Sequence, residues 1–214
     1  MAALGARFWR GFGRLGERGP ADGEKLMLIP GFLATDRTTL GLQRGLARAG
    51  YRVTGWGLGL NTGVQEDTLD RIVERIERFG GGGKVVLVGW SLGGVYAREA
   101  AKLRPDLVSK VVTLGSPFSG DRRSNNAWRL YELVAGHPVD QPPIDTVLEE
   151  KPTVPTLALW SRRDGIVAVA AARGADGERD AERELTCSHM GFAVSGSGIA
   201  EVVEAVRRFS QTPT

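Results

Sequence analysis

The chain has 214 residues, of which 42% are hydrophobic and 25% are charged. This composition is typical of one soluble globular domain. The formal net charge of +3 is accounted for by residues 1–20, with four arginines and one glutamate, so we expect no nucleic-acid binding by the balanced remainder. No apolar run is long enough to span a membrane, and the single cysteine, Cys187, favours a reducing, cytoplasmic compartment.

Residues 1–20 form a basic N-terminal segment that precedes the domain expected over residues 21–214. Its larger apolar residues recur at helical spacing: Leu4, Phe8, Phe12 and Leu15. One interpretation is a short amphipathic helix that makes weak contact with a membrane surface. The alternative, a segment that packs on the domain or frays, is favoured because four glycines lower its helix propensity.

Apolar runs bounded by turn residues predict six strands along the chain: Lys25–Pro30, Tyr51–Trp56, Val85–Val88, Val108–Leu114, Thr156–Trp160 and Glu182–Cys187. Helical spacing predicts helices between and after them: from a cap near Asp36 to Ala49, Gln65–Phe79, from the turn after Val88 to Leu103, Asn125–Ala135 and Ile199–Phe209. Residues 137–155 contain five prolines and are expected to be irregular, within a small cap over about 119–155, and residues 173–181 are expected to be exposed.

Strands that alternate with helices predict an α/β fold, with about six mostly parallel strands and helices on both faces of the sheet. The crossover connections are then right-handed. Functional residues of such a sheet gather beyond the carboxyl ends of its strands.

The strongest motif is a Gly-x-Ser-x-Gly turn formed by Gly89, Ser91 and Gly93, between the strand at Val85–Val88 and the following helix. Such a turn holds a serine in a strained conformation at the end of a parallel strand, with its hydroxyl near a helix N-terminus. The glycines are needed because strand and helix approach too closely for a Cβ. The alternative is an ordinary glycine-rich loop.

A serine nucleophile needs a base that accepts its proton, and the chain contains two histidines. His137 lies in the proline-rich stretch, whereas His189 follows the last predicted strand, at the same sheet edge as Ser91. Position therefore favours His189 as the base, with a surface loop histidine as the alternative.

The histidine in turn needs a carboxylate that orients it. Asp164 follows the strand Thr156–Trp160 and completes the chain order serine, aspartate, histidine. Asp164 could instead be a turn residue, since Gly165 follows it. Asp176 and Asp180 are alternative carboxylates in the polar stretch.

An acyl-transfer transition state carries an oxyanion, which needs two backbone N–H donors. One is expected from Leu92, directly after the serine, and the other from Phe32, with Leu33 as the near alternative. Pro30 has no N–H and cannot contribute.

Five stretches together resemble bacterial lipases and esterases of the α/β-hydrolase superfamily: Ile29–Phe32, Gly89–Gly93, Val111–Phe118, Ser161–Val167 and Ser188–Gly191. The resemblance implies ester hydrolysis through an acyl-serine intermediate, with no metal or organic cofactor. It implies Ser91, Asp164 and His189 as the triad and Phe32 and Leu92 as oxyanion donors. The first loop departs from the family pattern, because Pro30-Gly31 stands where His-Gly is usual.

The apolar residues expected to flank the site are Leu33, Trp90, Phe118 and Trp128. They predict a small-molecule acyl ester as substrate. The segment between Phe118 and Thr156 is short for a lipase lid, so we predict a carboxylesterase for short- to medium-chain acyl esters. A lipase or an acyltransferase is the alternative enzyme. A non-catalytic binding protein of this fold is opposed by the intact serine, aspartate and histidine. A membrane-tethered interaction module that uses residues 1–20 is a third alternative.

Overall fold

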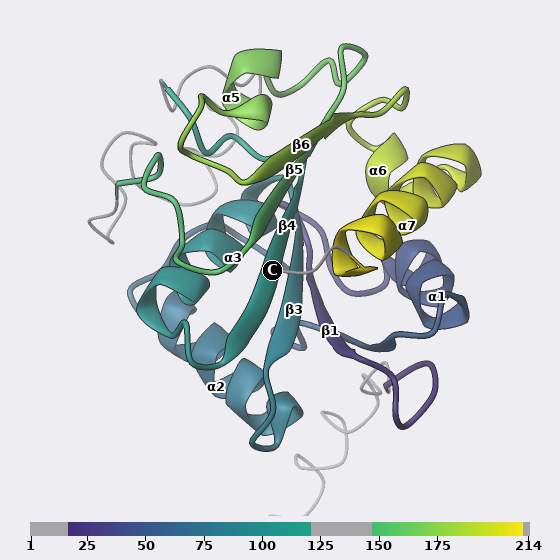
Figure 1. Cartoon of the computed structure of the whole chain (residues 1–214), viewed down its shortest axis with the longest axis vertical. Helices are drawn as coiled ribbons and strands as arrows, with labels where there is room; N and C mark the ends of the chain where they lie inside the picture. Colours follow the sequence, from purple (N-terminus) through teal and green to yellow (C-terminus); the bar gives the residue numbers. More distant parts are fainter. Residues whose placement is uncertain (1–16, 121–146, 212–214) are drawn as a thin grey trace, which may run out of the picture.

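The computed structural model describes residues 17–120 and 147–211. These residues form a central six-stranded sheet with helices packed against it (Figure 1). The strands are β1 (Lys25–Ile29), β2 (Arg52–Gly55), β3 (Val85–Trp90), β4 (Val108–Leu114), β5 (Thr156–Trp160) and β6 (Ala181–Glu184). They lie in the order β2-β1-β3-β4-β5-β6, and every neighbouring pair is parallel. The parallel sheet expected from the alternating pattern is therefore confirmed.

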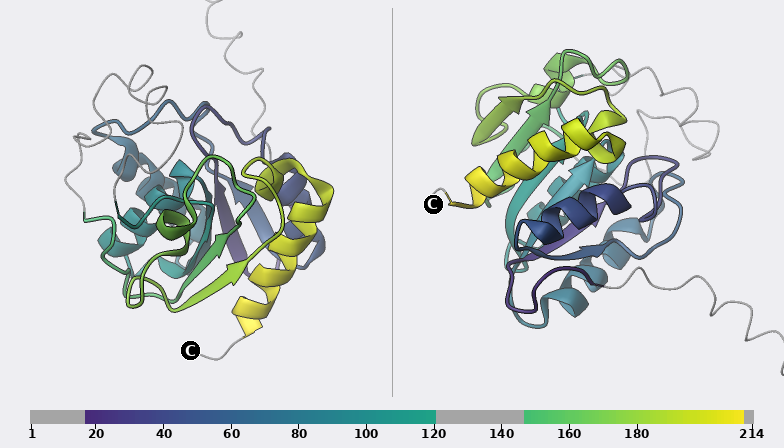
Figure 2. Two further views of the ribbon diagram at one scale, coloured as in Figure 1. Left: turned by 90° about the horizontal axis from the view of Figure 1, so that it is seen from above. Right: turned by 90° about the vertical axis from the view of Figure 1, so that its right-hand side faces the viewer.

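Helices cover both faces of the sheet. They are α1 (Leu40–Arg48), α2 (Thr68–Gly80), α3 (Leu92–Leu103), α5 (Val169–Arg173), α6 (Gly191–Val194) and α7 (Gly196–Gln211). Figure 2 shows α1 and α7 side by side on one face, while α2 and α3 lie on the other in Figure 1. Within the described residues, no helix is both long enough and apolar enough to cross a membrane.

Successive strand residues point to opposite faces and so contribute to two separate cores. In β1, Leu26 and Leu28 pack with α1 and α7, whereas Met27 and Ile29 pack with α2 and α3. All six residues of β3 are buried. A strand covered by helices on both faces is held rigidly, and this rigidity is passed to the turn that follows β3.

The last strand is shorter and earlier than the range expected from the sequence. Pairing with β5 ends at Glu184, and the chain then leaves the ladder, although Leu185 still donates a hydrogen bond to the Trp160 carbonyl at 2.7 Å. The apolar residues Leu185 and Cys187 are buried in the core rather than paired as strand. The prediction of a strand over Glu182–Cys187 was therefore wrong at both ends.

Asp36 does not cap the first helix as expected. Helix α1 begins at Leu40, and Thr39 is its N-cap residue. No side-chain hydrogen bond caps this end of the helix. The Asp36 carboxylate instead accepts hydrogen bonds at 3.0 Å from the backbone N–H groups of Trp56 and Gly57, after β2. Burial raises the pKa of this carboxyl above its ordinary value.

Part of the N-terminal segment joins the sheet edge. Arg18 and Val53 exchange two backbone hydrogen bonds, at 2.8 and 2.7 Å, and Glu17 pairs with Arg52. The folded body thus includes residues before position 21. Residues 1–16 and 121–146 lie outside the described residues, and with them the apolar stripe, most of the expected cap, the expected helix over 125–135, Trp128 and His137.

Candidate active site

Ser91 occupies the sharp turn between β3 and α3. Its backbone has φ +55° and ψ −125°, a region that a residue with a Cβ rarely adopts. The turn is held by hydrogen bonds from the Ser91 N–H to the Leu114 carbonyl at 2.8 Å and from the Gly94 N–H to the Ser91 carbonyl at 2.9 Å. Strain of this kind persists only where the surrounding structure fixes it, and it is concentrated at functional sites.

Glycine is required on both sides of this serine by close backbone contacts. A Cβ added to Gly89 would lie 2.2 Å from the Gly93 carbonyl oxygen, and a Cβ on Gly93 would lie 2.3 Å from the Ile29 carbonyl oxygen. The steric reason given for the motif is therefore confirmed. Gly94 was not singled out from the sequence, yet its Cβ would lie 2.0 Å from the Ser116 hydroxyl oxygen.

Asp164 and His189 form a buried hydrogen-bonded pair. The His189 Nδ1 lies 2.8 Å from the Asp164 Oδ2, and each residue is only 5% exposed. The other carboxylate oxygen accepts the backbone N–H groups of Ile166 at 3.0 Å and Val167 at 2.7 Å. An ionised carboxylate only accepts, so Nδ1 carries the proton and Nε2 is left as the basic nitrogen of the ring.

The alternative carboxylates are placed elsewhere. Asp180 accepts hydrogen bonds from the backbone and hydroxyl of Thr156, at the start of β5, and pairs with Lys151. Asp176 is fully exposed and pairs with Arg179. Among the three aspartates considered, Asp164 is the one that contacts His189.

Trp90 links the histidine loop to the serine turn. Its indole Nε1 donates a hydrogen bond to the His189 carbonyl at 3.0 Å, and the two ring centroids are 5.7 Å apart. Since Trp90 is the residue before Ser91, the backbone of His189 is tethered beside the strained turn. This contact could not be predicted from the sequence, because the partners are 99 residues apart.

Gly115 provides the space that the Asp164–His189 pair occupies. It has φ +54°, and an added Cβ would lie 2.7 Å from Asp164 Oδ2 and 3.2 Å from His189 Nδ1. Gly115 was not singled out from the sequence, although it lies in one of the stretches that resemble the family. Its position directly after β4, between the strand ends that lead to Ser91 and Asp164, was the available signal.

The loop after β1 lies directly beside Ser91. Strands β1 and β3 are neighbours, with Ile29 opposite Gly89, and a Cβ on Gly31 would lie 3.0 Å from the Ser91 Cβ. Leu33 has φ +56° and donates its N–H to the Asn61 carbonyl at 2.7 Å. The Leu33 N–H, the near alternative for an oxyanion donor, is therefore already engaged, and the N–H of Phe32 stays the prediction for this loop.

The three described residues expected to flank the site differ in exposure. Leu33 is 41% exposed, whereas Trp90 and Phe118 are 3% and 0% exposed. Burial gives Trp90 and Phe118 a packing role around the site. Met190, next to His189, is 45% exposed and was not singled out from the sequence.

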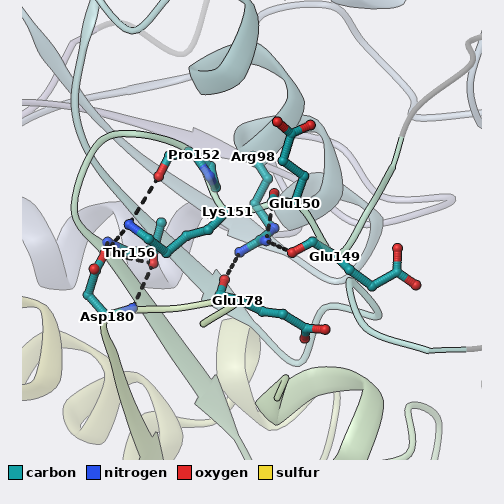
Figure 3. Close-up of polar contacts among 8 residues, drawn as sticks. All are labelled: Arg98, Glu149, Glu150, Lys151, Pro152, Thr156, Glu178 and Asp180. Carbon is teal, nitrogen blue, oxygen red and sulfur yellow. Dashed lines mark hydrogen bonds and ion pairs between the residues drawn. The ribbon is translucent and has the colours of Figure 1, made fainter. Parts of the chain in front are cut away.

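Arg98 anchors two chain segments that lie against α3. It extends from α3, is 1% exposed, and lies 4.1 Å from the ring centroid of Phe118. Its guanidinium donates to the carbonyls of Glu178 and Glu150, at 3.0 and 3.1 Å (Figure 3). A further hydrogen bond reaches the Leu148 carbonyl at 3.3 Å. Burial lowers the pKa of Arg98 to about 10. The neighbouring ion pair of Lys151 with Asp180 is drawn in the same view.

No group of three or more His, Cys, Asp or Glu side chains within residues 17–120 and 147–211 is arranged to hold a metal ion. The chemistry that the described residues offer is proton transfer and nucleophilic attack at one edge of a parallel sheet.

A strained serine after a central strand and a buried aspartate–histidine pair at the same edge are typical of α/β-hydrolase folds. Residues 25–141 match the family model described as "alpha/beta hydrolase fold". This match covers more than half of the chain, which therefore belongs to the α/β-hydrolase fold family.

A relative with a known activity matches only in part. Over 75 residues the chain is 35% identical to a pimeloyl-[acyl-carrier protein] methyl ester esterase of Nitrosospira multiformis. The match covers 35% of this chain and 27% of that protein, so the chain spans about a quarter of its relative.

Solved structures resemble this one over nearly its whole length. A lipase-esterase related protein of Clostridium acetobutylicum superposes with a TM-score of 0.65 at 15% identity, covering 91% of this chain and 98% of that chain. A metagenome-derived lipolytic enzyme superposes with a TM-score of 0.66 at 16% identity, and the match covers 92% of this chain and 97% of that chain. At such identities the likeness shows the shared fold.

Proposed function

We propose that the protein is a serine carboxylesterase that hydrolyses short- to medium-chain acyl esters through an acyl-serine intermediate. The observation that carries the proposal is the buried Asp164–His189 pair, tethered through Trp90 to the strained turn of Ser91. Structural packing alone does not require a serine with positive φ, because a glycine would relieve the strain.

In the first half-reaction the Ser91 hydroxyl oxygen attacks the acyl carbon, and its proton passes to Nε2 of His189. Asp164 holds the ring in this tautomer and stabilises the imidazolium that forms. The carbonyl oxygen becomes an oxyanion, which accepts hydrogen bonds from the N–H groups of Phe32 and Leu92. Leu92 opens α3, where the helix dipole also favours negative charge.

The tetrahedral intermediate collapses when the bond to the alcohol oxygen breaks and that oxygen takes the proton from His189. Water then attacks the acyl-serine, His189 removes a proton from it, and the acid leaves as Ser91 regains its hydrogen. Every proton lost by a nucleophile is returned to a leaving group, so no cofactor is needed for the reaction.

The substrate class is supported by two kinds of evidence. The partial relative named above is a methyl ester esterase, and the structural neighbours include lipolytic enzymes. Exposed Leu33 and Met190 adjoin the oxyanion loop and the histidine, and they offer apolar surface to an acyl chain. The same apolar surface also fits a lipase, or an acyltransferase in which an alcohol replaces water.

Labelling with a fluorophosphonate probe tests the nucleophile. The intact protein should react at one serine, and Ser91→Ala should abolish both labelling and hydrolysis of p-nitrophenyl esters. Ser109→Ala is the matched control, because Ser109 is a serine of β4 far from the strand's carboxyl end. Labelling that survives Ser91→Ala would overturn the proposal.

A series of p-nitrophenyl esters of increasing chain length tests the substrate class. We expect kcat/KM to peak at short or medium acyl chains; a maximum at long chains would favour the lipase. With excess alcohol in water, release of acid alone would exclude acyl transfer, and accumulation of a new ester would support it.

A further inference from the structure

Asn61 is fully buried in the loop between β2 and α2, and both its side chain and its backbone are hydrogen-bonded. A buried amide with satisfied donor and acceptor groups rigidifies what it joins, and removing it leaves unpaired partners.

The contacts of Asn61 bracket the loop that carries Phe32. The side-chain Nδ2 donates to the Pro30 carbonyl at 2.9 Å, before Phe32. After Phe32, the Asn61 carbonyl accepts the Leu33 N–H at 2.7 Å, and the Asn61 N–H donates to the Ala34 carbonyl at 2.9 Å. Three hydrogen bonds from one residue therefore fix the loop on both sides of the expected oxyanion donor.

This bracket also accounts for the strained conformation of Leu33. A leucine with φ +56° is costly and persists where its surroundings determine it. Its short hydrogen bond to Asn61 provides such a constraint. Within the loop, the Ala34 N–H also donates a hydrogen bond to the Gly31 carbonyl at 3.1 Å, so the Asn61 contacts add to a turn that the loop itself closes.

Asn61 also contacts α3, the helix that begins directly after Ser91. Its Oδ1 accepts a hydrogen bond from the Tyr96 hydroxyl at 3.3 Å and from the Gly63 N–H at 3.2 Å. Tyr96 is buried in α3, four residues after Leu92, which is the other expected donor. One side chain thus connects the loop that carries the first donor to the helix that carries the second.

We propose that Asn61 is the positioning residue of the oxyanion site and sets the N–H of Phe32 relative to that of Leu92. This inference rests on the proposed function, because it assigns a task to the same site. Asn61 touches neither substrate nor the reacting atoms. It acts through the loop, so its loss should weaken binding of the transition state more than binding of the substrate.

The test uses Asn61→Asp, which keeps the shape and the acceptor oxygen but removes the amide donor to Pro30. We expect kcat for p-nitrophenyl acetate to fall about 10- to 100-fold, as for a displacement of reacting groups by a fraction of an ångström to one ångström. We expect KM to change by less than about threefold, as for an interaction made only in the transition state. Affinity for a boronic acid, which forms a tetrahedral adduct with the serine, should fall with kcat.

Thr156→Val is the matched control, because Thr156 is also buried and hydrogen-bonded but is the first residue of β5, at the amino end of the strand. Figure 3 shows its hydrogen bonds with Asp180. It should lower the melting temperature and leave kcat and boronic acid affinity within about twofold. If Asn61→Asp does not fold, Tyr96→Phe removes the hydroxyl that donates to Asn61 and should lower kcat about 2- to 5-fold with KM retained.

A folded Asn61→Asp with kcat within twofold of the intact protein would overturn the inference and leave the proposed function standing. So would an unchanged kcat in Tyr96→Phe where Asn61→Asp does not fold. If the intact protein neither reacts with fluorophosphonate nor hydrolyses esters, the proposed function fails, and the inference fails with it.

Discussion

Gly115→Ala is the substitution that most directly tests the arrangement of the site, because it adds a single methyl group beside the aspartate–histidine pair. The added carbon would lie 2.7 Å from Asp164 Oδ2, 3.2 Å from His189 Nδ1 and 3.0 Å from the Phe192 ring. Carbon and oxygen in contact are about 3.3–3.6 Å apart, so the carboxylate would have to move by roughly 0.6 Å or more.

Two contributions to the loss of stability can be separated. An alanine with φ near +54° costs about 1–2 kcal/mol for its backbone conformation alone. Overpacking against Asp164 and Phe192 adds about 1–3 kcal/mol. We therefore expect the free energy of unfolding to fall by about 2–5 kcal/mol. Displacement of the carboxylate should also lower kcat by roughly 100-fold.

The assay combines urea denaturation with ester hydrolysis, and Gly82→Ala is the control. Gly82 has φ +89° but no atom within 4 Å of an added Cβ, and it lies in the turn before β3, at the opposite edge of the sheet. The control should lose only the backbone contribution and keep its full kcat. Equal stability losses in the two variants, with full activity in Gly115→Ala, would refute the placement of the pair.

Three further predictions concern separate parts of the molecule. Asp164→Asn should keep the fold, since an amide oxygen can still accept the N–H groups of Ile166 and Val167. Its kcat should fall about 10³- to 10⁴-fold, because the amide favours the wrong tautomer of His189. Activity near that of the intact protein would contradict this role. Burial raises the pKa of the Cys187 thiol to about 11, so iodoacetamide at pH 8 should alkylate the native protein roughly 100-fold more slowly than the unfolded chain, as mass spectrometry can measure. Arg98→Met should lower the free energy of unfolding in urea by about 2–4 kcal/mol, because the carbonyls of Glu178 and Glu150 lose the donor that this buried side chain provides; an unchanged midpoint would exclude the anchoring role.

Strand positions were predictable where apolar residues form an uninterrupted run. The bounds of β4 and β5 agree with the prediction, because both are interior strands with nearly all residues facing a core. The edge strand β6 reads Ala-Glu-Arg-Glu, which has no apolar pattern, and it is a strand only because β5 offers a free edge. Its position depends on the tertiary partner and could not be derived locally.

Short helices were missed for a related reason. Helix α5 has five residues and α6 has four, which is too short for a periodic pattern to be recognised. Ala171 and Ala172 of α5 are buried in one cluster with Trp160, so this helix is stabilised by contact with the body. Helices of this length depend on packing rather than on intrinsic propensity.

The residues proposed to react were accessible to sequence reasoning because each follows a strand of a parallel sheet. Ser91, Asp164 and His189 come after β3, β5 and β6, and parallel strands bring their carboxyl ends to one edge. Residue chemistry and position together were therefore enough to select them. The contacts that orient them were not accessible, since Trp90 and Gly115 act on partners distant in the sequence.

Asn61 shows what additional knowledge would have been needed. It lies in the loop after β2, and the strand order β2-β1-β3 makes that loop the neighbour of the loop after β1. Strand β1 has β2 on one side and β3 on the other, which makes this the point where the winding of the sheet reverses. Once the order of the strands is known, a buried amide in the loop after β2 is a reasonable candidate for joining the loop after β1 to the helix after β3. The reacting groups can be selected from local sequence patterns, whereas the residues that position them can be identified only from the order of the strands.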